Sequence, residues 1–376
     1  MVGFHESLAA TQAYLREGGS LERFESEHGI AGKSDGQHLI LDYDQITVKW
    51  TEPYAYACRG LVLDAVTFDV IAAPIKKFFN AGEHYADTID WSSATVFEKI
   101  DGTMVNRWWS PHTERFEYST RFQLPAGLES SAVNSGMMKW GDMIRRCMAS
   151  LDTAFLESQP KDETWTFEVC SPHNMVVVRH AAFFARLLAI KNIRSLEERS
   201  VATNHYGPKN YAFANADEVA AFANAHPATE LEGFVVVDAA FNRIKIKSDQ
   251  YVALHRAKDG LRSANNILLL ARSNDYEEIV VHFPEYKEDL DAATAIIEEL
   301  VSRHEAAFQR HRDVSSQKDF AIAIAAEGLE CTAALFSLRA GKVTSIGAAI
   351  AAMNETAFCK LLKPRLLEKI GAKYAE

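Results

Sequence analysis

Paired cysteines, long apolar runs and an excess of positive charge are all missing from this sequence of 376 residues. Its five cysteines are scattered without a Cys-x-x-Cys pair, which argues against a structural zinc site or a disulfide framework and is typical of a reducing cytoplasm. No apolar run approaches the roughly 18 residues of a membrane span, so we expect no membrane partner. The first residues lack a basic segment followed by an apolar one, so no signal peptide is expected.

The balance of charge is acidic, with a formal net charge of −11 at pH 7. This counts against non-specific nucleic-acid binding through the whole surface, which favours basic proteins, but it leaves room for a local basic groove. Hydrophobic residues make up 48% and charged residues 24%, as in ordinary globular proteins, and the length is sufficient for two domains.

The pattern of apolar residues divides the chain near residue 250. Before it, short helices are expected in residues 4–30, near 137–157 and in 216–225, with Asn215 as a cap, and short strands in 38–41, 60–63, 69–72, 94–97, 117–120, 164–170, 175–178, 183–190, 231–237 and 243–247. After Ser248, a plausible cap, helical spacing follows in 290–308, 320–338 and 346–370. We therefore predict an α+β domain followed by an all-helical one.

Four polar clusters lie on or beside the predicted strands and follow one another along the chain. They are Lys99-x-Asp101-Gly102, Phe167-Glu168-Val169, Glu232-Gly233-Phe234-Val235 and Lys245-Ile246-Lys247. Singly, each has a structural explanation, because strand ends often carry Glu and Lys-x-Lys is a common solvated strand face. Together they are typical of a site that handles a charged substrate.

Lys99 follows an apolar, strand-like run and precedes a turn at Gly102, where a lysine can serve as a nucleophile. Because a lysine attacks only when neutral, its usual pKa of about 10.4 must fall through burial or nearby positive charge. Lys245 and Lys247 share a strand face and could supply that charge, or they could hold a phosphate. Glu168 and Glu232 can bind ribose hydroxyls or the water ligands of a metal ion.

Two upstream fragments add cations that suit phosphate. Arg59 begins the run Arg59-Gly60-Leu61-Val62-Leu63, and paired cations stand beside paired aromatics in residues 76–79. Arginine matches phosphate oxygens by its fork geometry and lysine by its point charge. The alternative for Phe78 and Phe79 is simple core packing.

In this order the motifs resemble the covalent nucleotidyltransferase superfamily of ligases and capping enzymes. The fragments Arg-Gly-hydrophobic, Lys-Phe-Phe-Asn-x-Gly-Glu and Lys-Ile-Lys-Ser-Asp-x-Tyr-Val-x-Leu-His are similar to the RNA ligase 1 family of T-even phage type, from about Tyr43 to His255. The resemblance implies a nucleotidyltransferase (ATP-grasp-like ligase) domain of antiparallel sheets with helices over residues 1–250. An all-helical domain over 251–376 would follow and could act as an RNA or tRNA specificity module.

The resemblance also implies a role for each matching residue. Lys99 would take AMP from ATP as a phosphoramide, with Asp101 and Gly102 completing its motif. Glu168 would contact the ribose and metal-bound water, and Glu232 would act on the metal through water. The remaining matches are Lys245 and Lys247 at the α-phosphate, Arg59 and Lys77 at the β- and γ-phosphates, Tyr43 on the triphosphate side, Arg121 where the phage enzyme has lysine, Tyr251 at a position the family needs, and Asp275 as the nearest match to a metal-binding aspartate.

The function implied is an ATP-dependent RNA ligase that joins 5′-phosphate and 3′-hydroxyl ends of single-stranded or nicked-loop RNA, through lysyl-AMP and an adenylylated RNA 5′ end. ATP would donate AMP, and Mg²⁺ would assist, with Mn²⁺ able to replace it. The expected partner is RNA with such ends, including nicked tRNA in RNA repair. We expect a monomer in the cytoplasm of a bacterium or of a phage-infected host.

Three other functions compete with this one. DNA ligases and mRNA capping enzymes usually continue after Lys-x-Lys with a β-barrel, whereas the pattern here is helical. A non-catalytic RNA-binding relative is disfavoured by the intact set of lysines and carboxylates. In the helical part, four cations could form a patch that tracks phosphates or simply a solvated helix face: Arg256, Lys258, Arg262 and Arg272.

Overall fold

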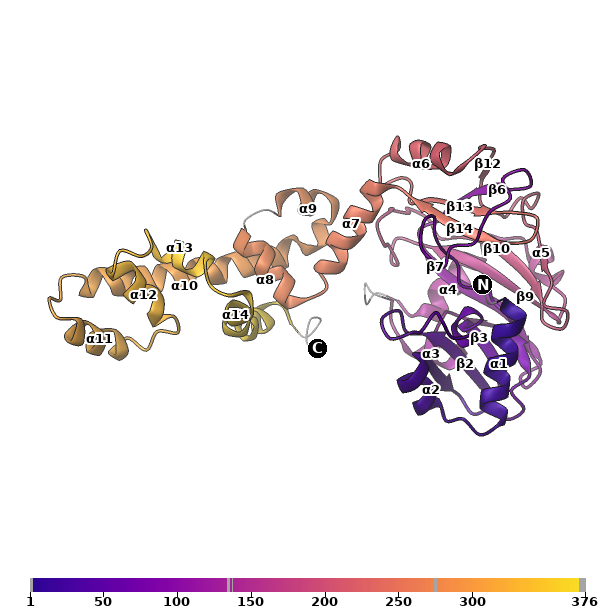
Figure 1. Cartoon of the computed structure of the whole chain (residues 1–376), viewed down its shortest axis with the longest axis horizontal. Coiled ribbons are helices and arrows are strands. Elements are labelled where there is room, and N and C mark those ends of the chain that lie inside the picture. The colour runs from indigo at the N-terminus through magenta and orange to yellow at the C-terminus, as the bar shows by residue number, and fades with distance from the viewer. Residues whose placement is uncertain (1–2, 134–135, 137, 274–275, 372–376) are drawn as a thin grey trace. The chain divides into compact units, whose positions relative to one another are not determined.

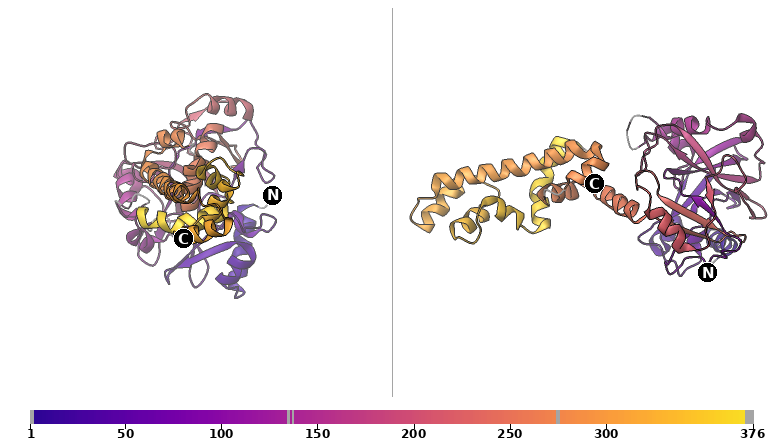
Figure 2. Two further views of the ribbon diagram at one scale, coloured as in Figure 1. Left: turned by 90° about the vertical axis from the view of Figure 1, so that its left-hand side faces the viewer. Right: turned by 90° about the horizontal axis from the view of Figure 1, so that it is seen from above.

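The computed structural model describes residues 3–133, 136, 138–273 and 276–371 (Figure 1). The chain divides into two compact units, Met1–Val252 and Ala253–Glu376. Figure 2 shows sheets with flanking helices in the first unit and helices in the second. The predicted fold class, α+β with antiparallel sheets followed by a helical part, is confirmed. The roles assigned to residues 1–250 and 251–376 remain predictions.

Three sheets form the frame of the first unit. The first has the order β1-β2-β3-β4 and is antiparallel throughout. The second is also antiparallel, in the order β11-β10-β9-β7-β8. Their strands are β1 Ile30–Ser34, β2 His38–Tyr43, β3 Arg59–Asp64, β4 Val70–Ala72, β7 Thr103–Ser110, β8 Arg115–Ser119, β9 Glu163–Cys170, β10 Phe184–Asn192 and β11 Glu198–Arg199.

The third sheet has the order β12-β6-β13-β14-β5, and only the β14–β5 pair is parallel. Its strands are β5 Phe79–Asn80, β6 Thr95–Glu98, β12 Asn210–Tyr211, β13 Gly233–Val237 and β14 Arg243–Lys247. The predicted closing pair of strands near 231–237 and 243–247 is therefore confirmed as the hairpin β13–β14. This sheet matters most for the site, because three of the four polar clusters lie at its strands.

Helices cover the sheets of the first unit. They are α1 Phe4–Arg16, α2 Leu21–His28, the 3₁₀ turn η1 Tyr54–Tyr56, α3 Pro125–Ser130, α4 Trp140–Met148, α5 Thr153–Glu157 and α6 Ala216–Asn224. The cap predicted at Asn215 is confirmed, because its side chain accepts a hydrogen bond from the backbone N–H of Glu218. The predicted helix 137–157 is two helices in its described part, α4 and α5.

The second unit contains helices packed on one core. They are α7 Asp249–Gly260, which starts in the first unit, α8 Ala264–Ser273, α9 Glu277–His282, the turn η2 Pro284–Tyr286, α10 Lys287–His311, α11 Gln317–Ala326, α12 Thr332–Arg339, α13 Ile346–Ala351 and α14 Glu355–Ile370. Leu290, Ile296 and Leu300 of α10 are fully buried in this core. Within the described residues, no helix has the length and apolar character that crossing a membrane requires.

Two expected long helices are broken in the structure. The segment 320–338 is divided between α11 and α12, with Gly328 at φ +64° between them, a backbone conformation that ends a helix. The segment 346–370 is divided between α13 and α14, and Asn354 caps the second of these through the N–H groups of Thr356 and Ala357. In both segments, residues that end or cap a helix interrupt it although the apolar spacing continues.

One predicted strand is wrong, and the strands β1, β5, β7, β11 and β12 were not predicted, β7 being the longest of them. Residues 175–178 form bends rather than a strand, and their backbone serves the site described below. The strand β7 was not predicted because Asn106 and Arg107 interrupt its apolar pattern. In the structure both side chains are buried and have polar partners. Thr166 donates to the Asn106 amide oxygen at 2.8 Å, and Arg107 donates to Gln159 at 2.5 Å.

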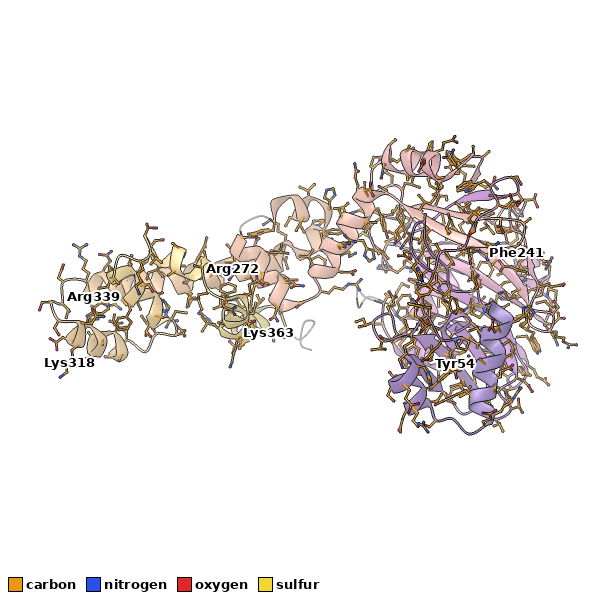
Figure 3. All side chains as sticks on the ribbon, viewed as in Figure 1. Tyr54, Phe241, Arg272, Lys318, Arg339 and Lys363 are labelled. Carbon is orange, nitrogen blue, oxygen red and sulfur yellow. The ribbon has the colours of Figure 1, made fainter. Side chains whose placement is uncertain are left out.

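The suggested cationic patch of the helical part is only partly present. Lys258 is buried, with its ammonium over the ring of Phe283. Arg272 (Figure 3) donates to the backbone oxygen of Met353 at 3.0 Å and covers the ring of Phe358. Only Arg256 and Arg262 are exposed, so the four cations do not form one phosphate-tracking surface.

A core substitution in α10 tests whether the units unfold separately. Leu300→Ala should destabilise the second unit by about 2–5 kcal/mol, because it leaves a cavity in a close-packed core. Urea unfolding followed by hydrogen exchange should show early loss of protection in 253–371 and unchanged protection in the β9–β10 pair. Ile322→Ala, at a side chain that is 60% exposed, is the matched control and should change little. Equal loss in both units would show that they unfold as one.

Candidate active site

The register of the third sheet gathers three of the predicted residues at one edge. Gly233 is opposite Lys247 in the β13–β14 hairpin. Lys99, the first residue after β6, donates its backbone N–H to the oxygen of Gly233 at 2.8 Å. Because neighbouring strands lie about 5 Å apart, Lys99, Glu232 and Lys247 meet although they are far apart in sequence.

Glu232 binds both lysines at once. Lys99 Nζ is 2.7 Å from Glu232 Oε2, and Lys247 Nζ is 2.9 Å from Oε1. Glu232 is 3% exposed, and burial alone would raise its pKa. The charges of Lys99 and Lys247 outweigh burial and hold the pKa of Glu232 below its usual value. The carboxylate is therefore ionised, and each of its two oxygens is paired with a lysine.

The charge state of Lys99 differs from the sequence-based expectation. Burial acts to lower the pKa of Lys99, but the nearby carboxylates of Glu232 and Glu168 outweigh it and raise that pKa. Lys99 is therefore an ammonium in the protein without ligand, and the expected fall through burial and the charges of Lys245 and Lys247 is wrong for this state. A neutral amine at this position would require Glu232 to exchange its partners.

Asp101 is fixed from three directions. Its Oδ2 accepts the backbone N–H groups of Val177 and Val178 at 2.8 and 2.7 Å, and its Oδ1 accepts the hydroxyl of Tyr251 at 2.8 Å. Burial raises the pKa of Tyr251, so this hydroxyl keeps its proton and remains a donor. The wrongly predicted strand at 175–178 thus supplies two donors that hold the turn after Lys99.

Two glycines are required by close backbone approach. A Cβ at Gly102 would lie 2.6 Å from both the backbone oxygen of Val169 and the sulfur of Cys170. Gly233 has φ +142°, and a Cβ there would lie 2.2 Å from the oxygen of Ile246. Larger residues would push the Lys99 turn away from β9 or separate β13 from β14.

The remaining charged side chains of the site are half-buried without full compensation. Burial raises the pKa of Glu168, on β9, to about 7. Burial, followed by the charges of Lys77, Lys99 and Arg59, lowers the pKa of Lys245 to about 7. Burial also lowers the pKa of Arg59. Perturbed groups of this kind concentrate at functional sites, and the surplus of cations around Lys245 favours an anionic ligand.

A cavity of about 200 Å³ contains these groups. One part of its wall is apolar and the other is charged, which suits a nucleotide with its base on the first and its phosphates on the second. Leu188 reaches the cavity because the β9–β10 register shifts between Leu187 and Ala189. The apolar part consists of Ile75, Phe78, Phe97, Ile100, Leu188, Pro208, Val235 and Val237, and the charged part of Arg59, Glu98, Lys99, Glu168, Arg243, Lys245 and Lys247.

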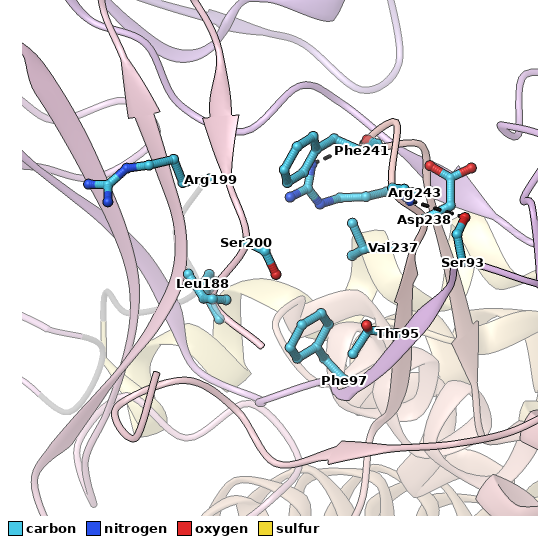
Figure 4. Close-up of a pocket in the computed structure, with 12 residues that line it drawn as sticks. Ser93, Thr95, Phe97, Leu188, Arg199, Ser200, Val237, Asp238, Phe241 and Arg243 are labelled. Carbon is cyan, nitrogen blue, oxygen red and sulfur yellow. Dashed lines mark hydrogen bonds between the residues drawn. The ribbon is translucent and has the colours of Figure 1, made fainter. Parts of the chain in front are cut away.

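Arg243 was missed by sequence reasoning. It continues the cations of β14 by two residues, so an Arg-x-Lys-x-Lys alternation was the available signal. Its guanidinium forms a buried ion pair with Glu198. With Phe97, Leu188 and Val237 it separates the cavity from a smaller one of about 150 Å³, which Arg199 and Phe241 also line (Figure 4). Arg243 therefore closes the end of the apolar part.

The residues predicted on the triphosphate side are also brought together. Lys77 Nζ lies 5.2 Å from the ring centroids of Tyr43 and Trp50 and 4.8 Å from that of Phe79. The Arg121 guanidinium lies 4.8 Å from the ring centroid of the same Tyr43 and binds the Asp42 carboxylate at 2.8 Å. Tyr43 is thus shared by the two cations, and neither Trp50 nor Asp42 was foreseen.

The core-packing alternative for the paired aromatics is also correct. Phe78 and Phe79 are both buried. Phe78 nevertheless lies 5.7 Å from the Arg59 guanidinium and 5.5 Å from the Lys245 ammonium. Each aromatic ring therefore packs in the core and faces a cation of the site with one surface.

The carboxylates suit a metal ion that keeps most of its water. Among the described residues, no group of three or more His, Cys, Asp or Glu side chains could hold a metal. Mg²⁺ commonly uses one or two carboxylates, several waters and the phosphates of its substrate. Glu168 and Glu232 lie close enough to influence each other, and the incompletely compensated Glu168 fits such a role. Asp275 lies outside the described residues.

These features define a class of protein: an α+β domain with a half-buried lysine beside a buried carboxylate, in a cation-rich cavity. A family model described as RNA ligase matches residues 57–251, about half of the chain. The chain belongs to this RNA ligase family.

Individual relatives are distant. A putative bifunctional polynucleotide kinase/RNA ligase of Autographa californica nuclear polyhedrosis virus is 22% identical over 275 residues, which is 66% of this chain and 38% of that protein. Among solved structures, Naegleria gruberi RNA ligase with PPi has a TM-score of 0.31 at 14% identity, covering 44% of this chain and 52% of its own. An archaeal ATP-dependent RNA ligase has a TM-score of 0.42 at 14% identity, covering 94% and 81%. The chain spans well under two thirds of the curated viral relative.

Replacing Lys245 should stabilise the protein in a pH-dependent way. The pKa of Lys245 is about 7 in the folded protein against 10.5 normally, so between these values the unfolded chain binds the extra proton and stability rises with pH. Lys245→Met removes this penalty, which is complete below the folded pKa. The gain in unfolding free energy should be roughly 2 kcal/mol larger at about pH 6 than at about pH 9.

Urea unfolding at the two pH values measures this difference. Lys287→Met, at an exposed lysine of the second unit, is the matched control and should show no such dependence. A gain for Lys245→Met that does not vary with pH would mean that Lys245 is charged in the folded protein at both values.

Proposed function

We propose that this chain is an ATP-dependent RNA ligase that works through an adenylylated Lys99. The observation that carries the proposal is the contact of Lys99 with Glu232, at 2.7 Å, in a cavity whose cations exceed its carboxylates. Membership of the RNA ligase family supports RNA as the substrate. The joined ends would be a 5′-phosphate and a 3′-hydroxyl, and nicked tRNA is one candidate RNA.

The first step forms the lysyl adenylate. When Glu232 releases it, Lys99 loses a proton, and its nitrogen lone pair attacks the α-phosphorus of ATP. The bond between that phosphorus and the bridging oxygen breaks, and pyrophosphate leaves with the electron pair. Lys245 and Lys247 would neutralise the α-phosphate, while Arg59, Lys77 and Arg121 would hold the leaving group beside Tyr43. Bound magnesium would add positive charge at the phosphates, with water and carboxylate ligands.

The next two steps use the energy of this bond. An oxygen of the RNA 5′-phosphate attacks the α-phosphorus, the phosphorus–nitrogen bond breaks, and Lys99 regains a proton. The 3′-hydroxyl then loses its proton and attacks the activated 5′-phosphate, from which AMP leaves. Glu232 and Glu168 would pair with the ammonium that Lys99 forms again. The turn held by Asp101 would keep the amine of Lys99 in line with the reacting phosphorus.

The decisive experiment is incubation with ATP labelled at the α-phosphate. Wild-type protein should carry the label, and Lys99→Ala should carry none, because Lys99 is the amine that the proposal makes the nucleophile, whereas Lys245 and Lys247 only neutralise the α-phosphate. Lys287→Ala, which removes an exposed lysine, should be labelled like the wild type. Label on Lys99→Ala would refute the nucleophile assignment, and an unlabelled wild type would refute the proposal.

A substrate comparison separates the ligase classes. The helical second unit, in place of the β-barrel expected of DNA ligases and capping enzymes, favours RNA. We expect a 5′-phosphorylated RNA to be joined at least about ten-fold faster than DNA of the same sequence, because the RNA 2′-hydroxyl is the group by which such proteins distinguish the two. Offering each strand with and without a complementary splint shows whether the natural end is single-stranded. Faster joining of DNA would contradict the RNA assignment.

A further inference from the structure

A second cavity, of about 460 Å³, reaches the same reactive residues from another direction. Arg59, Lys99 and Glu168 line both this cavity and the nucleotide cavity. All other lining residues belong to one cavity alone. Its further lining comes from β1, the start of β7, the loop after β8 and the start of α4. That lining is Lys33, Gly102, Thr103, Met104, Thr120, Arg121, Phe122, Gln123 and Trp140. Lys99 thus stands where two separate chambers meet.

The chemistry of this lining suits nucleic acid. Four cations line the cavity against the single carboxylate of Glu168, in a chain whose net charge is −11. The local surplus of positive charge is therefore a property of this cavity and not of the whole surface. Thr103, Thr120 and Gln123 add hydrogen-bonding groups that can meet sugar and phosphate oxygens.

Two aromatic side chains complete the resemblance to a nucleic-acid groove. Phe122 and Trp140 are both only partly buried, so each offers ring surface to the cavity. Lys33 Nζ lies 4.1 Å from the centroid of the Phe122 ring, which places an exposed cation beside a stacking surface. Grooves for single-stranded RNA combine these elements, because every base has a face that stacks on an aromatic ring and every nucleotide carries a phosphate.

The transfer chemistry explains why such a groove would open at Lys99. A group held on Lys99 can pass to a second substrate only if that substrate reaches the same phosphorus atom. Arg243, which pairs with Glu198, bounds the apolar part of the nucleotide cavity, whereas the second cavity reaches Lys99 from the side of β1 and α4. The second cavity gives the approach, and Arg121 of its lining contacts Tyr43, which belongs to the triphosphate side.

We propose that the second cavity binds the end of the single-stranded RNA that accepts AMP, with a terminal base stacked on Phe122 or Trp140 and a backbone phosphate at Lys33. This proposal rests on the proposed ligase function for its chemistry. It assigns the RNA end to the first unit itself, through residues that do not line the nucleotide cavity. The aromatic contacts predict tolerance of base sequence at the RNA end.

The experiment measures RNA binding and lysine adenylylation separately. A short 5′-phosphorylated RNA with a fluorescent 3′ end is titrated with Lys33→Ala, Phe122→Ala and Trp140→Ala, and anisotropy gives its Kd. We expect each aromatic substitution to weaken binding about ten-fold, as the loss of one base–aromatic stack does. Trp140→Phe should retain most of the affinity, since a ring is kept.

Adenylylation in the absence of RNA serves as the second measurement. The three alanine variants should form labelled protein at the wild-type rate, because none of the three residues lines the nucleotide cavity. Transfer of AMP to RNA, and sealing of RNA that already carries AMP, should both need more RNA to reach half-maximal rate. These variants would therefore separate the first step from the two later ones.

Matched controls come from a similar pair elsewhere in the first unit. Lys161 Nζ lies 3.7 Å from the ring centroid of Trp109, and neither residue lines the two cavities. Lys161→Ala and Trp109→Ala should leave the RNA Kd unchanged, which excludes a general effect of losing a surface cation or ring.

Three outcomes would overturn the proposal. An unchanged RNA Kd in all three variants would remove the RNA from this cavity. Equal weakening by the Trp109 and Trp140 substitutions would show non-specific binding. Loss of adenylylation together with unchanged RNA affinity would place the cavity in the ATP site. A wild-type protein that binds RNA but takes no label would instead refute the ligase function and leave the RNA subsite supported by the Kd series.

Discussion

The site depends on the ion pairs that the carboxylate of Glu232 forms with Lys99 and Lys247. The carboxylate lies between Lys99 and Lys247, and all three are brought together by the register of β6, β13 and β14. Loss of one member of a buried ionic group leaves the others uncompensated, which is far more costly than loss of an exposed ion pair. The position of the Lys99 amine is therefore coupled to the folding of the sheet.

These ion pairs also set the resting state of the protein. The carboxylates of Glu232 and Glu168 outweigh burial and keep the amine of Lys99 as an ammonium; in the proposed reaction it attacks only once Glu232 gains other partners. A reactive lysine that is protonated by default is protected from unwanted acylation or phosphorylation. The ordered approach of a triphosphate and its metal ion would then supply the exchange, because both bring strong competing charges to the same place.

The surplus of cations elsewhere in the cavity lowers the stability of the folded protein and favours the binding of an anion. Lys245 and Arg59 are half-buried, and removal from water, together with neighbouring cations, lowers the pKa of each. Such an arrangement persists because the strands that carry these side chains are held by hydrogen-bonded neighbours and by apolar packing behind them. The two cavities meet at Arg59, Lys99 and Glu168, and under the proposed mechanism one amine would serve two substrates in turn.

Much of the site could be read from the sequence, because motifs of residue type and spacing record which groups must be present. Lys99, Glu232, Lys245 and Lys247 all lie in one cavity wall or contact it, as the ordered clusters indicated. Helices and the β13–β14 hairpin were also predictable, since their apolar periods and the Asn215 cap are local signals. A strand such as β7, whose polar residues are buried with distant partners, has no local signal.

The sequence by itself determined the inventory of charges, the α+β class of the first unit and the helical nature of the second. Only the tertiary structure decided the charge on Lys99, because its pKa depends on a carboxylate 133 positions away in the chain. It likewise turned residues 175–178 into donors for Asp101, closed the nucleotide cavity with Arg243 and placed Lys33, Phe122 and Trp140 around one opening. Distances between side chains on different strands arise from register and packing, and no run of neighbouring residues encodes them.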